Sequence, residues 1–149
     1  MERAINTFFY VAILIALAGV VLGAIYGAVV GTFVFVLGGG TFGGMLFGGY
    51  FGAIGGVPLS IVVGIAVAIA QSRYERPYTA EQARFIGRVG DVIALIMCIA
   101  GVVFLAGSSG DIIFFGIPAI ITFLACHWII LHYLRKHTVA SKPKAKNIA

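Results

Sequence analysis

The longest uncharged run of the chain constrains its fold more than any other feature. No Asp, Glu, Lys or Arg occurs between Arg3 and Arg73. A helix needs roughly 20 apolar residues to cross the hydrocarbon core of a bilayer, so this run is long enough for two spans. A soluble domain has about a quarter of charged residues, whereas this chain has 10% charged and 61% hydrophobic residues. We therefore predict an all-α integral membrane protein, with the lipid bilayer as a partner of its apolar surface.

Small residues recur at every fourth position inside this run. Residues four apart lie on nearly the same face of an α-helix, and a row of glycines on that face leaves a groove into which a second helix can press. Helices in lipid associate in this way, because lipid tails give no hydrophobic drive between helices. We therefore predict glycine-zipper packing of the first two helices. The small residues of these rows are Gly19, Gly23, Gly27 and Gly31, then Gly40, Gly44, Gly48, Gly52, Gly56, Ser60 and Gly64.

The rows resemble the glycine-zipper segments of channels, pinholin-like lysis proteins and translocase-type membrane subunits. This resemblance implies a packing device that unrelated proteins share. The second helix also carries glycines that lie about 100° or more away from its main row. One face of that helix would receive the first helix while another receives a neighbour, so we expect a homo-oligomer or a subunit of a larger membrane complex. The additional glycines are Gly39, Gly43, Gly49 and Gly55.

The apolar segments predict four spans arranged as two hairpins in one membrane domain, residues 1–149. A triplet of glycines and Gly43 mark the first turn, because glycine is unfavourable inside a helix. Thr79 and Gln82 predict a capping box at the start of the third helix, and Pro58 predicts a kink in the second. An alternative parse has five spans, three of them before residue 71. The predicted spans are 6–36, 44–70, 88–106 and 112–134, with a cytoplasmic loop at 71–87 and a basic tail at 135–149.

Basic residues gather in the loop and in the tail. Cytoplasmic segments of membrane proteins are enriched in Lys and Arg, so both termini are expected in the cytoplasm of a bacterial inner membrane, or on the equivalent side of an organelle membrane. The formal net charge of +5 is explained by this topology, and we predict no nucleic-acid partner.

Few ionisable residues lie near membrane depth. Asp91 follows Arg88 by three residues, which predicts an interfacial Arg88–Asp91 pair. His127 and His132 are five residues apart, about 140° around a helix, so they do not bind one metal from the same face. His127 remains a possible ligand for a haem, quinone or metal if another subunit completes the site. We predict no metal site and no cofactor within this chain.

The sequence contains no motif for catalysis. No glycine loop is followed by the Lys and Ser or Thr of a phosphate site, and no Ser or Cys has an evident base beside it. We therefore expect a non-enzymatic, oligomerising or accessory subunit of a membrane complex, without catalytic residues. Two alternatives are an oligomeric pore, channel or small-solute transport protein, and a haem- or quinone-linked redox subunit that uses His127.

Overall fold

The computed structural model describes residues 2–34, 40–105 and 109–138, which form four helices. Each helix is built from apolar residues with few charges. The helices are α1 (Glu2–Val34), α2 (Gly40–Ser72), α3 (Ala80–Leu105) and α4 (Ser109–Lys136).

All four helices include a stretch that is long and apolar enough to cross a membrane. The described residues thus hold four candidate spans, as predicted, and not the five of the alternative parse. The protein is in this respect compatible with an integral membrane protein. The candidate spans are Ala4–Phe33, Gly40–Ser72, Ala80–Phe104 and Phe115–Lys136.

Two helices begin before the approximate starts of the predicted spans. The second helix begins at Gly40 rather than at residue 44, because the backbone of Gly40 lies directly against Gly31 of α1 and this packing offsets the low helix propensity of glycine. The fourth helix begins at Ser109 rather than at residue 112. Residues 37–39 of the predicted first turn lie outside the described residues. Residues 139–149 of the predicted basic tail also lie outside them.

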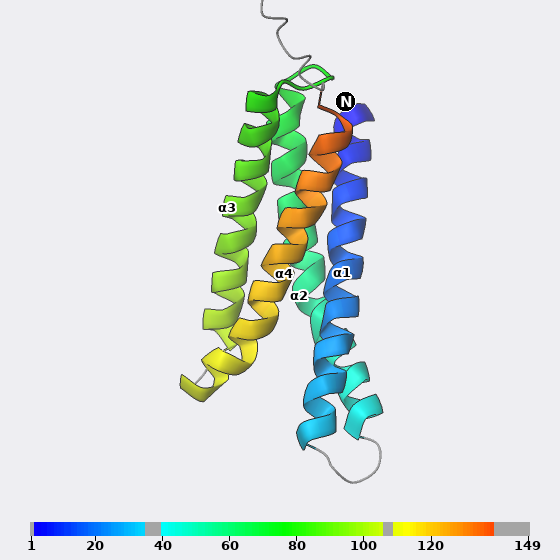
Figure 1. Ribbon diagram of the computed structural model, residues 1–149, viewed down its shortest axis with the longest axis vertical. Helices are drawn as coiled ribbons and strands as arrows, with labels where there is room; N and C mark the ends of the chain where they lie inside the picture. The colour runs from blue at the N-terminus through cyan, green and yellow to red at the C-terminus, as the bar shows by residue number, and fades with distance from the viewer. Residues whose placement is uncertain (1, 35–39, 106–108, 139–149) are drawn as a thin grey trace, which may run out of the picture.

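The helices run up and down in one bundle (Figure 1). The start of α1 and the end of α4 lie at the same end, together with the connection between α2 and α3. Helix α1 contacts α2 and α4, and helix α3 contacts α2 and α4. At the opposite end, the lower parts of α3 and α4 diverge from α1 and α2 (Figure 1).

The shared hydrophobic core lies in the half of the bundle near the N-terminus. On α2 the buried residues begin only at Gly56 and continue to Gln71. All four helices contribute to this core, and its fully buried side chains include Val11, Val63, Ile86 and Ile130. The packing that fixes all four helices together is thus confined to one end.

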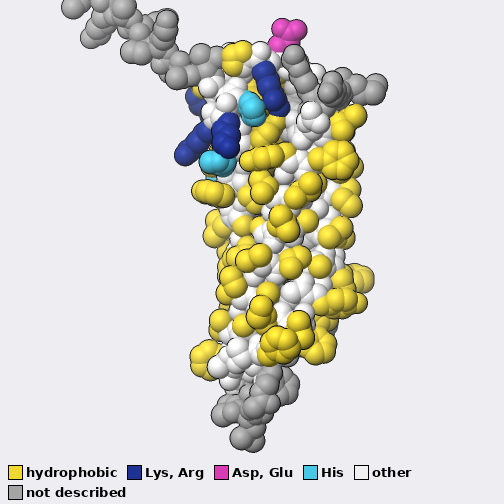
Figure 2. Space-filling model, turned by 90° about the vertical axis from the view of Figure 1, so that its right-hand side faces the viewer, with side chains coloured by type: hydrophobic (Ala, Val, Ile, Leu, Met, Phe, Trp, Pro, Cys, Tyr) yellow, Lys and Arg dark blue, Asp and Glu magenta, His cyan; other side chains and the backbone are white. Residues whose placement is uncertain are grey.

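The surface separates into an apolar body and a charged end (Figure 2). On the face shown, hydrophobic side chains cover most of the length, while Lys, Arg, His and acidic side chains gather at one end. Large hydrophobic side chains are exposed on every helix, among them Phe9, Phe47, Phe104 and Trp128. Such a surface suits contact with lipid tails, which solvate apolar side chains without cost.

The connection between α2 and α3 is short and well bonded. The predicted capping box is confirmed: the Thr79 amide donates to Gln82 Oε1 at 2.9 Å, and the Gln82 amide donates to Thr79 Oγ1 at 3.3 Å. The Tyr78 amide donates to the carbonyl of His137 at 2.9 Å, which ties this connection to the end of α4.

Candidate functional site

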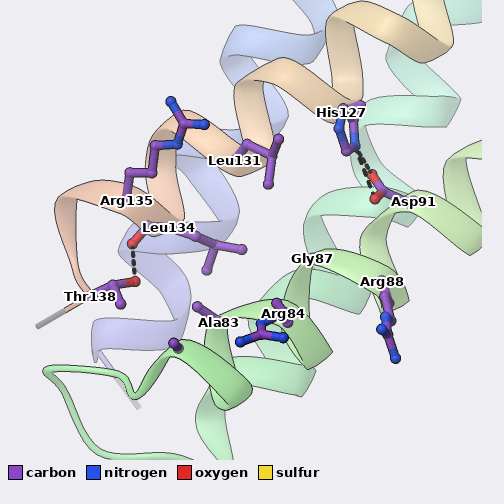
Figure 3. Close-up of a pocket in the computed structure, with 11 residues that line it drawn as sticks. Ala83, Arg84, Gly87, Arg88, Asp91, His127, Leu131, Leu134, Arg135 and Thr138 are labelled. Carbon is purple, nitrogen blue, oxygen red and sulfur yellow. Dashed lines mark hydrogen bonds and ion pairs between the residues drawn. The ribbon is translucent and has the colours of Figure 1, made fainter. Parts of the chain in front are cut away.

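Asp91 of α3 and His127 of α4 form a carboxylate–imidazole pair inside the apolar part of the chain. His127 Nδ1 lies 2.9 Å from both carboxylate oxygens of Asp91, and the two side chains point toward each other in Figure 3. The side chain of His127 is 42% exposed and that of Asp91 is 25% exposed. An ionisable pair within helices that are apolar enough to span a membrane marks a candidate functional site.

The sequence predicted an interfacial pair of Arg88 and Asp91. The structure does not place these two side chains against each other. Arg88 extends away from Asp91 in Figure 3, and among the described residues the ion pair of Asp91 is the one with His127. The three-residue spacing puts Arg88 and Asp91 on one side of α3. His127 of the neighbouring helix is nevertheless the residue whose side chain lies within hydrogen-bond distance of Asp91. His127 was predicted only as a possible ligand, and the contact of its Nδ1 leaves Nε2 as the nitrogen for any further bond.

An open groove of about 580 Å³ surrounds this pair. It lies between α3 and α4 at the charged end of the bundle, and Figure 3 shows residues of both helices along it. Three arginines, the Asp91–His127 pair and a set of apolar or small residues form its lining. The arginines are Arg84, Arg88 and Arg135, and the other residues include Ala83, Gly87, Leu131 and Leu134. We call this region the α3–α4 groove.

A second polar site surrounds the guanidinium of Arg76. Its Nε donates to the Tyr78 hydroxyl at 3.1 Å, and its Nη2 donates to Thr7 Oγ1 at 3.0 Å and to the Tyr133 hydroxyl. The hydroxyls of Tyr78 and Tyr133 donate to Gln71 Oε1 at 3.0 and 3.3 Å. We call these five residues the Arg76 cluster. It bonds the start of α1, the end of α2, the α2–α3 connection and the end of α4 to one another.

The partners in the Arg76 cluster are buried, while Arg76 itself is partly exposed and carries a positive charge. Tyr78 and Thr7 are each only 1% exposed, and Gln71 and Tyr133 are also buried. The hydrogen-bond partners of Arg76 are neutral, and within the described residues no carboxylate forms an ion pair with it. Its positive charge acts on a neighbour outside the spans: burial lowers the pKa of the His137 imidazole below the ordinary 6.5, and Arg76 and Lys136 lower that pKa further.

The predicted small residues lie where α1 and α2 meet. A Cβ placed on Gly27 would come within 2.7 Å of Gly48 Cα, and a Cβ on Gly23 within 2.9 Å of Gly52 Cα. At the two ends of the contact, Gly19 would meet Gly56 Cα at 3.1 Å, and Gly31 would meet Gly44 Cα at 3.0 Å.

Two further positions of the predicted row lie beyond this backbone contact. Gly64 faces side chains, Phe8 and Ala12 of α1, rather than backbone. Ser60 is buried and donates its hydroxyl to the carbonyl of Val57 in its own helix. The row therefore changes character toward the charged end, where side chains instead of glycines fill the space between α1 and α2.

The cysteines and the remaining histidines lie among aromatic and apolar side chains. Cys126 is buried in the core and Cys98 packs against that core, both as free thiols. His132 stacks on Trp128 with ring centroids 5.3 Å apart, and the ring of His137 contacts that of Tyr133 at 4.9 Å. Among the described residues, no three His, Cys, Asp or Glu side chains are grouped so as to hold a metal ion.

Sequence reasoning missed the Asp91–His127 pair and the Arg76 cluster. The partners of the pair are 36 residues apart, and Thr7 and Arg76 are 69 residues apart. One signal was available: Thr7, Gln71 and Tyr133 each lie near the end of an apolar segment on the side predicted to be cytoplasmic. Polar side chains at equal depth in neighbouring spans are candidates for mutual hydrogen bonds, because buried polar groups need partners.

Comparison with known protein families, with curated proteins and with solved structures found no match to this chain. A function must therefore come from the residues themselves. The chain offers two polar sites at one end of the bundle and a close backbone contact between α1 and α2.

Proposed function

We propose that this protein is a non-enzymatic membrane subunit that self-associates through the outward face of α2. In this proposal α1 and α2 form a glycine-zipper hairpin, and the hairpin is the rigid element that presents the contact surface. Helix pairs in lipid are stabilised by close packing, which glycine permits. The short distances between glycine backbones of α1 and α2 support this part of the proposal.

The observation that carries the proposal is the open space at Gly43 and Gly55. Most described glycines of α2 face α1, but a Cβ at either of these two positions would meet nothing within 4 Å. Glycine in a helix costs about 1 kcal/mol relative to alanine. Among the described residues no contact offsets that cost at Gly43 and Gly55, so we infer that another helix approaches there.

A second copy of this chain is the partner that the surface fits best. Phe47 and Tyr50 project from the same part of α2 and are 69% and 63% exposed. Residues 43, 47 and 50 follow one another at helical steps of four and three, so the glycine and the two rings share a face. A two-fold symmetric interface needs a surface that is complementary to itself, and projecting rings beside the open Gly43 meet that need.

The orientation follows from the charges. Arg73, Arg76, Arg84 and Arg88 lie at the same end as Arg135 and Lys136. Because cytoplasmic segments are enriched in Lys and Arg, we propose that this end and both termini lie in the cytoplasm of a bacterial inner membrane.

Oligomer mass tests the proposal. Native mass spectrometry of the full chain from mild detergent should show a dimer or higher oligomer for the parent, and monomer for Gly43→Leu and Gly55→Leu. Ala100→Leu on α3 is the control, because this residue is exposed, lies outside the proposed interface and is not a glycine. A monomeric parent protein, or variants as oligomeric as the control, would contradict self-association.

Two further measurements separate the alternatives of pore and redox subunit. Dye release from liposomes that depends on the protein and is lost in Gly55→Leu would assign a pore instead of a structural subunit. A Soret band in the visible spectrum of the purified protein would assign a haem ligand role to His127.

A further inference from the structure

The α3–α4 groove carries positive charge that the described residues do not neutralise. Arg84, Arg88 and Arg135 line the groove and are exposed. The carboxylate in the lining, Asp91, is paired with His127, and no ion pair joins any of these arginines to an acidic side chain within the described part of the chain. The groove is therefore complementary to an anion.

Apolar side chains from both helices also line the groove. Ala83, Leu131 and Leu134 lie along it. Beyond the Asp91–His127 pair, the surface of α3 and α4 continues with exposed hydrophobic side chains, including Leu95 and Leu124. A ligand that fits the whole groove thus has an anionic group at the charged end and a hydrocarbon part that follows the helices.

The position of the groove defines the ligand further. The groove lies where the charged end of the bundle meets the apolar body, which is the depth of the lipid headgroups if the helices cross a bilayer. Basic pockets between transmembrane helices on the cytoplasmic side bind anionic headgroups. A phosphate ester suits arginine in particular, because the guanidinium donates two parallel hydrogen bonds to its oxygens.

We propose that the α3–α4 groove binds the headgroup of an anionic phospholipid. Arg84 and Arg88 of α3 and Arg135 of α4 supply the positive charge that attracts the phosphate, and the acyl chains lie on the apolar surface beyond Leu131. The Asp91–His127 pair lies at the inner side of the headgroup, where the imidazole is available to donate or accept a hydrogen bond. Lipid rather than free phosphate is the ligand, because the groove continues into apolar surface.

Lipid binding to the full chain tests this assignment. Native mass spectrometry in detergent would measure retention of phosphatidylglycerol, of phosphatidylcholine with the same acyl chains, and of inorganic phosphate. We expect phosphatidylglycerol to be retained over phosphatidylcholine, and the double variant Arg84→Gln, Arg135→Gln to weaken its binding roughly tenfold or more. The control variant Arg73→Gln, Lys136→Gln loses the same charge outside the groove and should bind within about twofold of the parent.

Three outcomes would overturn the proposal. The first is equal retention of the two lipids, and the second is equal loss in the groove variant and the control variant. The third is displacement of phosphatidylglycerol by inorganic phosphate at equal concentration, which would assign a free anion as the ligand. An unchanged melting temperature for both double variants would show that a loss of lipid is not a loss of fold.

Discussion

The contact between α1 and α2 is made by backbone atoms, whereas the contact between α3 and α4 is made by side chains. Between α1 and α2, glycine backbone meets glycine backbone, and a Cβ on Gly27 would come within 2.7 Å of Gly48 Cα. Between α3 and α4, side chains meet: a Cβ on Gly90 would approach the terminal methyl of Ile130 at 2.8 Å, and Asp91 bonds to His127. An atom added at a backbone contact forces the helices apart, whereas a side chain can change its rotamer to make room. The contact between side chains of α3 and α4 also leaves space for a polar groove.

The largest effect is expected from Gly27→Ala. The added methyl group would overlap the backbone of α2, so the two helices must separate along their length. Overpacking that moves backbone costs about 3 kcal/mol or more. Thermal unfolding in detergent, followed by circular dichroism, should show a large drop in melting temperature. Gly101→Ala, which meets open space, is the control, and equal melting temperatures for the two variants would contradict the backbone contact.

The next largest effect is expected from Arg76→Gln. Glutamine is too short to reach Thr7, Tyr78 and Tyr133 together, so buried hydroxyl groups of the Arg76 cluster lose a charged partner at about 2 kcal/mol. The same unfolding measurement should show a clear loss of stability. Arg73→Gln, an exposed position at the end of α2, should leave stability nearly unchanged. If both substitutions have the same effect, the cluster does not hold the four segments together.

Gly90→Ala should cost less than Gly27→Ala and thereby sharpens the comparison. The methyl group would meet Ile130 Cδ1 at 2.8 Å and Val67 Cγ2 at 3.0 Å. Both obstacles are ends of side chains, and Ile130 Cδ1 moves by a change of rotamer, so we expect a cost of about 1 kcal/mol. Thermal unfolding of Gly90→Ala and Gly27→Ala, measured in parallel, tests this difference in stability. A cost at Gly90 as large as that at Gly27 would show that α3 and α4 are packed as rigidly as α1 and α2.

The smallest effect concerns pH. Because the pKa of His137 is lowered in the folded protein, the unfolded chain binds a proton more readily than the folded one. Stability is therefore highest above the ordinary value of 6.5 and falls as pH decreases from there toward the lowered pKa. Melting temperatures measured between about pH 7.5 and about pH 5.5 should fall less in His137→Gln than in the parent. An equal fall of the melting temperature in His137→Gln and in the parent would contradict this prediction.

Several features of the fold were predictable because their cause is local. The absence of charge between Arg3 and Arg73 determines the length of the apolar segments, and an apolar segment of this length can span a bilayer as a helix. The Thr79–Gln82 capping box involves residues three apart, so its two hydrogen bonds follow from the sequence. The four-residue spacing of the glycines likewise determines that they share a face of each helix.

The tertiary structure alone decided which faces meet. Periodicity places Asp91 on one face of α3, but the rotation and axial offset of α4 decide whether His127 or Arg88 is its partner. The same two quantities bring Thr7 and Tyr133 to Arg76 and place Arg84 and Arg135 along one groove. They depend on the packing of all four helices in the shared core, which no single segment of the chain encodes. The sequence by itself therefore determined four apolar helices with rows of glycine, and the packing of the core determined the polar sites.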